Sequence, residues 1–187
     1  MQNDKASEIL SVARKAMMER GYNGFSFRDL AAEVGIKSAS IHYHYPTKAA
    51  LAEAAARDYR EWCSKTLDGL SAADAPGMLF AYGNLFVEIL KDEGRVCLGG
   101  VLAIDATTLP PRVRAEVERF FEGHHEWLSA VLRDGQRNGE IRPDINPERF
   151  AQAFVSGVEG AMMVARGIGK PDHLTQTIDQ LIQLVRR

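Results

Sequence analysis

The amino-acid sequence predicts an all-α protein of about nine helices. Apolar residues recur at intervals of three and four along nearly the whole chain of 187 residues. No sustained alternation of apolar and polar residues, the pattern of a β-strand, interrupts them. Glycine, proline and serine or threonine residues separate the periodic segments, as helix caps and short connections do. Apolar residues make up 45% of the chain, which is enough for a substantial core.

The composition predicts a cytoplasmic protein without a membrane partner. No apolar stretch approaches the roughly 20 residues that cross a bilayer. The first ten residues, MQNDKASEIL, lack the basic and apolar regions of a secretion signal. The two cysteines, Cys63 and Cys97, are far apart, so neither a disulfide framework nor a CxxC site is predicted.

Charge is unevenly distributed along the chain. Its formal net charge is -2. Residues 1–50 contain seven Lys or Arg and five Asp or Glu, whereas residues 51–187 contain sixteen and twenty. A mildly basic first part and an acidic remainder permit a nucleic-acid contact at one end of the molecule.

The first two predicted helices are marked by caps at both ends. A helix over residues 5–20 has an apolar stripe and ends at Gly21. Ser26 is expected to cap a short helix over residues 27–34, with Asp29 at the third helical position. Gly35 ends this second helix.

A third short helix completes a predicted helix-turn-helix. Ser38 is expected to cap a helix over residues 39–45, and Thr47 to cap a long helix that begins at Lys48. Ile36 and Ile41 are expected to fill the junction between the two short helices. The polar residues around them are then left on the outside.

The segment KSASIHYHYPTK, residues 37–48, is unusually rich in polar aromatic side chains. An exposed short helix with small residues first and hydrogen-bonding side chains after them can enter a major groove about 12 Å wide. We expect Tyr43 and Lys48 to contact phosphates. Candidates for base edges or nearby phosphates are Lys37, Ser38, Ser40, His42 and His44.

Three other interpretations of this segment compete with DNA contact: a metal site, a catalytic histidine and a solvated face. His42 and His44 diverge by about 200° on a helix, so they chelate a metal poorly. A catalytic histidine lacks a partner nucleophile. The polar side chains can also be no more than a solvated face. We expect DNA contact, with no metal, no cofactor and no catalytic residue.

The segment FSFRDLAAEVGIKSASIHYHYPTKAAL resembles the DNA-binding head of the TetR family of bacterial transcriptional repressors, and the resemblance covers about residues 5–55. The matching positions are Ser26, Arg28-Asp29-Leu30-Ala31, Gly35-Ile36, Tyr43 to Tyr45, and Lys48 with Leu51. Ser26 and Arg28 are therefore also expected at the DNA, although Arg28 can instead pair with an acid of its own helix. Ala39 and His42 depart from the family pattern, which leaves the operator sequence open.

The resemblance implies a homodimeric repressor that binds a palindromic operator and leaves it when a small-molecule effector binds. It divides the chain into a DNA-binding domain, residues 1–48, and an effector-binding and dimerisation domain, residues 49–187. Two other classes remain as alternatives, a small helical enzyme and a helical protein-interaction module.

Helices are expected over about residues 48–70, 77–92, 111–138, 147–166 and 171–187, and an apolar segment with two glycines lies at 96–108. The first of these helices should direct one stripe inward, comprising Leu51, Ala55, Tyr59, Trp62, Thr66 and Leu70. We expect the last two helices to pack against a second copy as a four-helix bundle, as in the family. An ordinary core within one chain is the alternative. The interface residues predicted are Phe150, Phe154, Gly157, Ala161, Leu174, Ile178, Leu181 and Ile182.

An effector cavity is expected among the helices of the second domain. Its candidate lining residues are Trp62, Tyr82, Phe86, Cys97, Phe120, His124, Trp127 and Met162. The alternative is that these side chains only fill the core. Cys97, beside Arg95 and near a helix start, resembles the sensor cysteine of TetR-like regulators that respond to electrophiles, with Lys170 as a candidate partner. The alternative is a buried, inert thiol.

Overall fold

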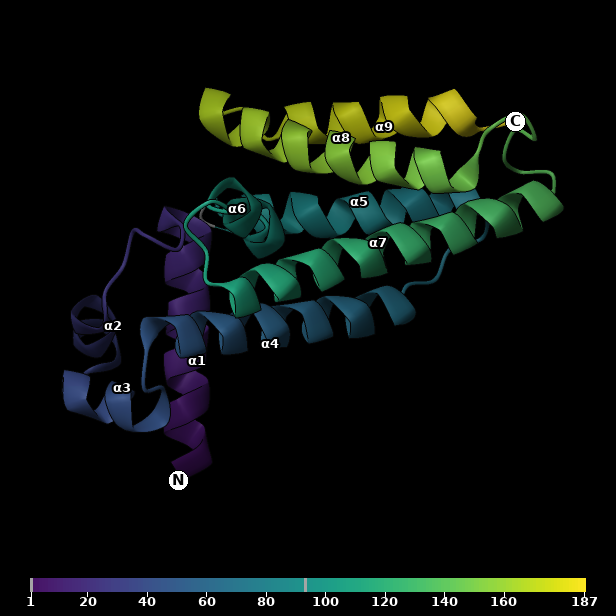
Figure 1. Cartoon of the computed structure of the whole chain (residues 1–187). Helices are drawn as coiled ribbons and strands as arrows, with labels where there is room; N and C mark the ends of the chain where they lie inside the picture. Colours follow the sequence, from purple (N-terminus) through teal and green to yellow (C-terminus); the bar gives the residue numbers. More distant parts are fainter. Residues whose placement is uncertain (1, 93) are drawn as a thin grey trace. The chain divides into compact units, whose positions relative to one another are not determined.

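The computed structural model describes residues 2–92 and 94–187, with side chains from residue 5 onward (Figure 1). Within these residues the chain forms nine α-helices and no strand, apart from one isolated bridge between Ile141 and Arg186. The all-α prediction is confirmed. None of the helices so described is long and apolar enough to cross a membrane.

The helices follow the predicted order closely. Their bounds are α1 Gln2–Arg20, α2 Phe27–Val34, α3 Ser38–His44, α4 Lys48–Asp68, α5 Ala75–Lys91, α6 Leu98–Ile104, α7 Pro111–Arg137, α8 Pro147–Ile168 and α9 Asp172–Val185. The apolar segment with two glycines contains α6, and both Gly99 and Gly100 are buried in this short helix.

The chain forms two compact units. The first unit comprises Met1–Cys63 and Leu98–Phe120, and the second comprises Ser64–Cys97 and Phe121–Arg187. The division thus falls within α4 and α7. The functional boundary at residue 48 stays a prediction.

Local capping explains the ends of the short helices in the first unit. Gly21 follows α1 with φ 76°, and Gly35 ends α2 with φ 73°, a left-handed conformation that glycine adopts without a steric penalty. The Ser26 hydroxyl accepts a hydrogen bond from the Asp29 amide at 3.3 Å, and the Asp29 carboxylate accepts one from the Ser26 amide at 2.8 Å. This is the predicted capping box.

The predicted cap of α3 is wrong by one residue. Lys37, in an extended conformation, stands at the N-cap without a side-chain hydrogen bond, and Ser38 is the first helical residue. The cap predicted for α4 is confirmed, because the Thr47 hydroxyl accepts a hydrogen bond from the Ala50 amide at 3.1 Å.

The core of the first unit holds α1, α2 and α3 together. Leu30, Ala31 and Val34 of α2 are buried, and Ile41 of α3 is fully buried. Ile41 is the only buried residue among those of α3 that the structure describes, so the rest of this helix is on the outside.

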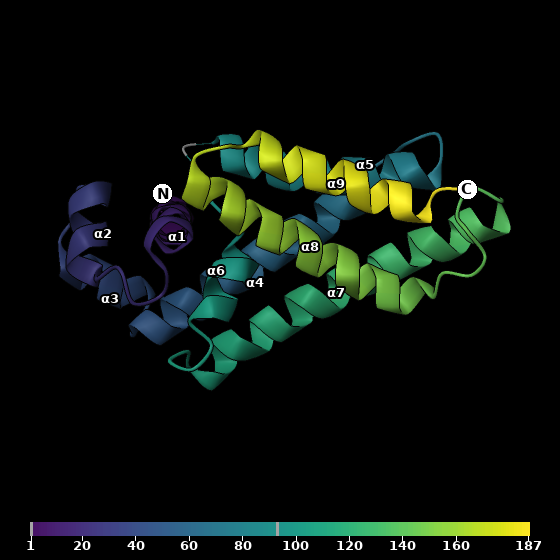
Figure 2. The same ribbon diagram turned by 90° about the horizontal axis from the view of Figure 1, so that it is seen from above.

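In the second unit, α8 and α9 lie side by side in opposite directions and pack against α5 (Figure 2). Close approach is secured by glycines. A Cβ on Gly83 would lie 2.8 Å from Ile178, and a Cβ on Gly157 would lie 2.7 Å from Leu181. These helices therefore interlock through positions that have no side chain.

Candidate nucleic-acid interface

The outer face of α3 is centred on Tyr43. This side chain is 73% exposed, although Ile41 two positions earlier is fully buried. Ala39 lies one helical turn before Tyr43 and is also exposed, so the two residues share the outer face. Ala39 was missed as a candidate, and its spacing of four residues from Tyr43 was the signal available in the sequence.

The predicted polar residues of α3 occupy different environments. Lys37 and Ser40 are exposed, and Ser38 is half-buried. His42 is exposed, but its ring packs edge-on against Phe27 at 4.7 Å and its Nδ1 lies 3.3 Å from the Pro46 carbonyl oxygen. His44 packs edge-on against Tyr43 at 5.2 Å. The two histidine rings therefore have separate neighbours.

The Lys48 side chain points toward Tyr22 and Phe25, in the turn between α1 and α2. Its ammonium donates a 2.5 Å hydrogen bond to the Phe25 carbonyl and lies over the rings of Phe25 and Tyr22, at 4.3 and 4.9 Å from their centres. Burial lowers the pKa of Lys48, while Asp29 and Asp105 act in the opposite direction. In this position Lys48 connects the start of α4 to the turn before α2.

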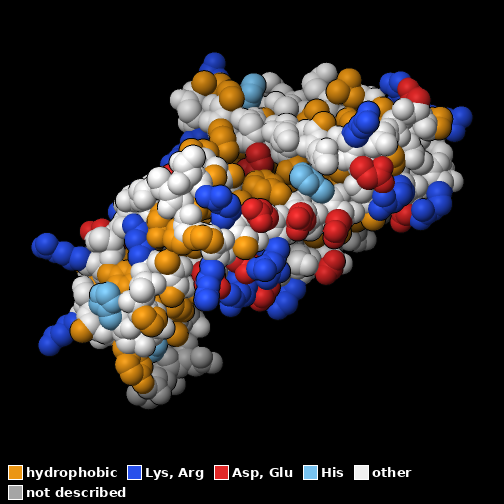
Figure 3. Space-filling view, in the orientation of Figure 1, with side chains coloured by type: hydrophobic (Ala, Val, Ile, Leu, Met, Phe, Trp, Pro, Cys, Tyr) orange, Lys and Arg blue, Asp and Glu red, His pale blue; other side chains and the backbone are white. Residues whose placement is uncertain are grey.

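Separate Lys and Arg side chains project from the surface on the side of α2 and α3 (Figure 3). Arg28 and Lys37 are both exposed. Within the chain as described, neither residue takes part in an ion pair. The charge of Arg28 nevertheless helps to lower the pKa of Asp29, after the hydrogen bonds with Ser26, so both roles considered for Arg28 stay predictions.

The turn between α1 and α2 is attached to the end of α6. The Tyr22 amide donates to Asp105 Oδ2 at 2.7 Å, and Asn23 Nδ2 donates to Thr108 Oγ1 at 2.9 Å. Both bonds lie within the first unit. They fix the segment that leads into the helix-turn-helix.

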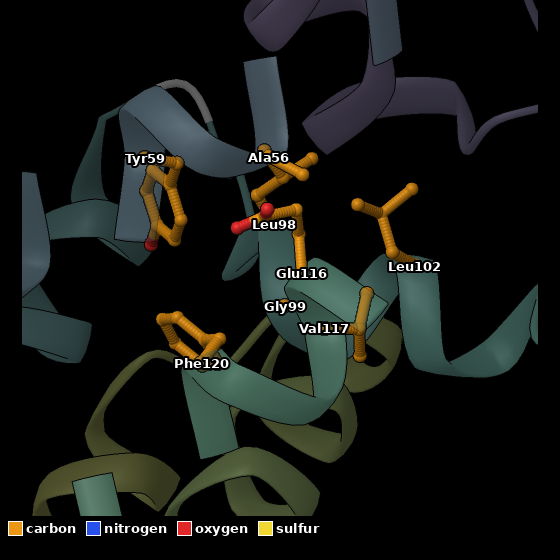
Figure 4. A pocket seen from close by; sticks show the side chains of 8 residues that line it. All are labelled: Ala56, Tyr59, Leu98, Gly99, Leu102, Glu116, Val117 and Phe120. Atoms are coloured by element: carbon orange, nitrogen blue, oxygen red, sulfur yellow. The ribbon is translucent and has the colours of Figure 1, made fainter. Parts of the chain in front are cut away.

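A small pocket lies among α4, α6 and α7 of the first unit (Figure 4). It holds about 180 Å³ of space, part of it open to solvent. Its lining residues are Ala56, Tyr59, Leu98, Gly99, Leu102, Glu116, Val117 and Phe120. Phe120, a predicted pocket residue, stacks on Tyr59 with ring centres 5.8 Å apart.

Glu116 is a buried carboxylate tied to three arginines. Arg60 Nε lies 2.9 Å from it, Arg119 Nη1 lies 2.7 Å from it and Arg57 Nε lies 3.6 Å from it. Burial raises the pKa of Glu116, but the Arg60 hydrogen bond and the three positive charges outweigh it, so the pKa is lowered. These contacts bind α4 to α7.

The inward orientation predicted for Trp62 is wrong. Its side chain is 46% exposed, with its ring 5.7 Å from that of Tyr59. Trp62 and Phe120 belong to the first unit, whereas the remaining predicted pocket residues belong to the second.

In the second unit, Tyr82 and His124 form a buried polar pair. The Tyr82 hydroxyl and His124 Nδ1 share a hydrogen bond of 2.8 Å. Burial, with a smaller effect of His125, lowers the pKa of His124 to about 3, so its imidazole is neutral. Phe86 and Trp127, also predicted pocket residues, lie 5.2 and 6.0 Å from the Tyr82 ring.

Cys97 is fully buried and contacts two residues of α8. Its amide donates to the Met162 sulfur at 3.3 Å, and its side chain is hydrogen-bonded to Glu159. Glu159 was missed in the sequence. The signal was its position among Val155, Val158 and Met162, where the helical period places it on the apolar face.

Most residues predicted at a dimer interface lie in the core of their own chain. Phe154 and Leu174 are fully buried, and Ile178 is 1% exposed. Ala161 and Ile182 are also buried, while Phe150, Gly157 and Leu181 are half-buried. Gly157 and Leu181 contact each other within one chain. The buried members of this set therefore fit the alternative prediction, an ordinary core within one chain.

The opposite face of α8 is exposed and partly apolar. Ser156, Gly160, Val164 and Ile168 follow one another at intervals of four residues, and all are exposed. Nothing lies within 4 Å of a Cβ built on Gly160. Leu184 of α9 is 58% exposed.

Comparison with known proteins identifies the family. Residues 9–55 match the family described as "Bacterial regulatory proteins, tetR family", and residues 79–181 match "Tetracyclin repressor-like, C-terminal domain". The repressor DhaR of Mycobacterium sp. (strain GP1) is 25% identical over 179 residues, which cover 95% of this chain and 88% of DhaR. The repressor KstR2 of Mycobacterium tuberculosis is 30% identical over 146 residues, which cover 77% of this chain and 72% of KstR2.

A solved structure agrees with these matches. The crystal structure of a TetR-family transcriptional regulator from Agrobacterium tumefaciens has a TM-score of 0.96 at 29% identity and covers 100% of both chains. The C-terminal family match alone spans more than half of this chain. The chain belongs to the TetR family of transcriptional regulators, which are DNA-binding proteins and not enzymes.

Proposed function

We propose that this regulator binds a palindromic operator as a homodimer, with α3 in the major groove, and that a small-molecule effector releases it. The observation that carries the proposal is the 73% exposure of Tyr43 on a helix anchored by the fully buried Ile41. A two-fold dimer supplies two such helices for half-sites about 34 Å apart.

The contacts proposed for α3 follow from its exposed face. Tyr43 donates its hydroxyl to a phosphate, and Arg28 and Lys37 add positive charge beside it. Ser40 reaches a base edge, and the Ala39 methyl meets a thymine methyl. Ser26, Ser38, His42 and His44 remain candidates for further contacts. Because the Lys48 ammonium bonds to Phe25, it contacts a phosphate only by leaving that carbonyl or by using a second proton.

The dimer is proposed to form through the exposed faces of α8 and α9. Gly160 leaves room for a partner helix to approach closely, and Val164, Ile168 and Leu184 supply apolar surface that folding of the chain leaves uncovered. The effector is proposed to bind in the second unit, where Tyr82, His124 and Glu159 place polar groups in an apolar setting.

The test is a gel-shift titration with the DNA that flanks the gene of the regulator, repeated at several salt concentrations. Tyr43→Phe and Lys37→Ala should each weaken binding to all sequences, and Lys37→Ala should reduce the salt slope by about 0.9. Lys170→Ala, which changes an exposed lysine of the second unit, serves as the control. Unchanged affinity in both α3 variants would exclude the proposed docking.

A further inference from the structure

Glu159 is a buried carboxyl group that the protein does not fully satisfy. It is 7% exposed, and its Oε1 has no hydrogen-bond partner among the residues described. The side chain of Cys97 is its hydrogen-bond partner. A thiol is a weak donor, so this bond compensates little of what the carboxyl group loses on leaving water.

Burial and the hydrogen bond with Cys97 are the influences on the pKa of Glu159, and no positive charge of the described residues contributes to it. Arg95, which precedes Cys97 by two residues, lies 2.5 Å from Asp92. Helices α5 and α9 pack along α8, and Arg133 of α7 pairs with Glu148 at the start of α8. The charged or chargeable side chains on α5 and α9, apart from the buried Tyr82, are exposed or half-exposed: Glu88, Lys91, Asp172, His173 and Asp179.

The surroundings of Glu159 on its own helix are apolar and deformable. Val155, Val158 and Met162 are buried on the same side of α8. Methionine is unbranched and adopts several shapes at little cost, so Met162 can move aside for a small guest. A guest at this place would meet a carboxyl group, a thiol and apolar walls.

The charge of the Glu159 carboxyl group decides which class of ligand can bind beside it. Burial raises the pKa of Glu159 to about 7, so the group is about half ionised at neutral pH. A buried carboxylate is stable only beside a positive charge. A neutral hydroxyl would satisfy Oε1 but leave the charge uncompensated, and an anion would be repelled.

We propose that Glu159 anchors the effector of this regulator, and that the effector is a small apolar molecule carrying a protonated amine. The ammonium donates to Oε1, and the apolar part packs against Met162. This inference rests on the proposed response to a small molecule in the second unit.

The test is thermal unfolding of the whole protein with three probes of the same size, n-butylamine, 1-butanol and butyrate, at pH 6 and pH 8. Butylamine is protonated at both pH values, because an alkylammonium has a pKa of about 10.4. At a few times its Kd, it should raise the Tm by about 2–4 °C at pH 8, and by less at pH 6. The alcohol and the carboxylate should have smaller effects.

Variants assign the effect to Glu159. Glu159→Gln keeps the shape of the side chain and should abolish the rise in Tm that butylamine causes. Cys97→Ala keeps the carboxyl group and should retain the shift. Glu126→Gln, which changes an exposed glutamate of α7, should behave as the unaltered protein.

Three results would overturn the inference: no shift with butylamine, an equal shift with 1-butanol, or a shift that persists in Glu159→Gln. The gel-shift titration distinguishes failure of this inference from failure of the proposed function, because it measures DNA binding in the absence of butylamine, 1-butanol and butyrate. Glu159→Gln should bind DNA as the unaltered protein does and no longer respond to butylamine.

Discussion

A Cβ built on Gly21 would lie 2.7 Å from Oδ2 of Asp105, the oxygen that accepts the Tyr22 amide. The turn that leads into the helix-turn-helix and the end of α6 are therefore in contact through a position that admits no side chain. Gly21 also has φ 76°, so two separate constraints act on one residue.

Gly21→Ala should destabilise the protein more than Gly35→Ala does. Both glycines are left-handed, which costs alanine about 1–2 kcal/mol. Gly35 has open space around it, whereas Gly21 faces Asp105. Urea unfolding of the two variants gives the comparison. Equal losses of stability would show that the Asp105 side chain moves aside for the new Cβ without a loss of folding free energy.

Lys48→Met should reduce stability by about 1–3 kcal/mol, because the variant keeps the apolar stem but leaves the Phe25 carbonyl without its donor. Tyr43→Phe, on the exposed side of the same unit, should change stability by less than about 0.5 kcal/mol. Thermal unfolding of both variants is the measurement. A Lys48→Met protein as stable as the parent would contradict an internal role for this lysine.

Glu116→Gln should destabilise the first unit by about 1–3 kcal/mol, because three arginines lose a charged partner. The loss stays moderate because two of these arginines, Arg57 and Arg119, are largely exposed to solvent. Glu118→Gln, two residues later and exposed, is the matched control. The lowered pKa of Glu116 means that its contribution is present above the unfolded pKa and is lost as the pH falls through the folded pKa. The difference between the two variants should therefore shrink in acid.

Stability between about pH 4.5 and 6.5 should depend on two buried groups that act in opposite directions. His124, with its pKa lowered from 6.5 to about 3, is neutral in the folded state and protonated in the unfolded state, so its contribution falls as the pH falls. Glu159, with its pKa raised from 4.5 to about 7, is protonated in the folded state and ionised in the unfolded state, so its contribution falls as the pH rises.

Removing one group should reveal the other. Glu159→Gln should make stability fall by about 1.4 kcal/mol per pH unit on acidification through this window, relative to the parent. His124→Asn should show the opposite trend. Urea unfolding at half-unit pH steps measures both slopes, and parallel profiles for parent and variants would show that neither group is shifted as described.

Gly160→Arg should convert the proposed dimer to a monomer, because the long side chain would stand on the open face of α8 where a partner helix is expected. Asn84→Arg on the exposed side of α5 is the control and should leave the dimer intact. Sedimentation velocity distinguishes the two species. A monomeric parent protein would remove the dimer from the proposal.

Helix order and the helix-turn-helix could be predicted from the sequence because they depend on local interactions. The Ser26–Asp29 capping box, the left-handed Gly35 and the Thr47 cap each involve residues within four positions of one another. The residues that make such contacts can be read from a short stretch of sequence. The one local error, at Ser38, is a single position, which is the usual uncertainty of helix ends.

The sequence alone determined the all-α class, the positions of the helices and the family, since periodicity, caps and motif spacing are properties of neighbouring residues. Only the tertiary structure decided which side of a helix is inside when both sides carry apolar residues. It buried Phe154 and Ile178 and exposed Val164 and Ile168. It also turned the Lys48 ammonium toward Phe25 and enclosed Glu159 beside Cys97. Each of these outcomes depends on contacts between segments far apart in the chain, which helical spacing does not encode.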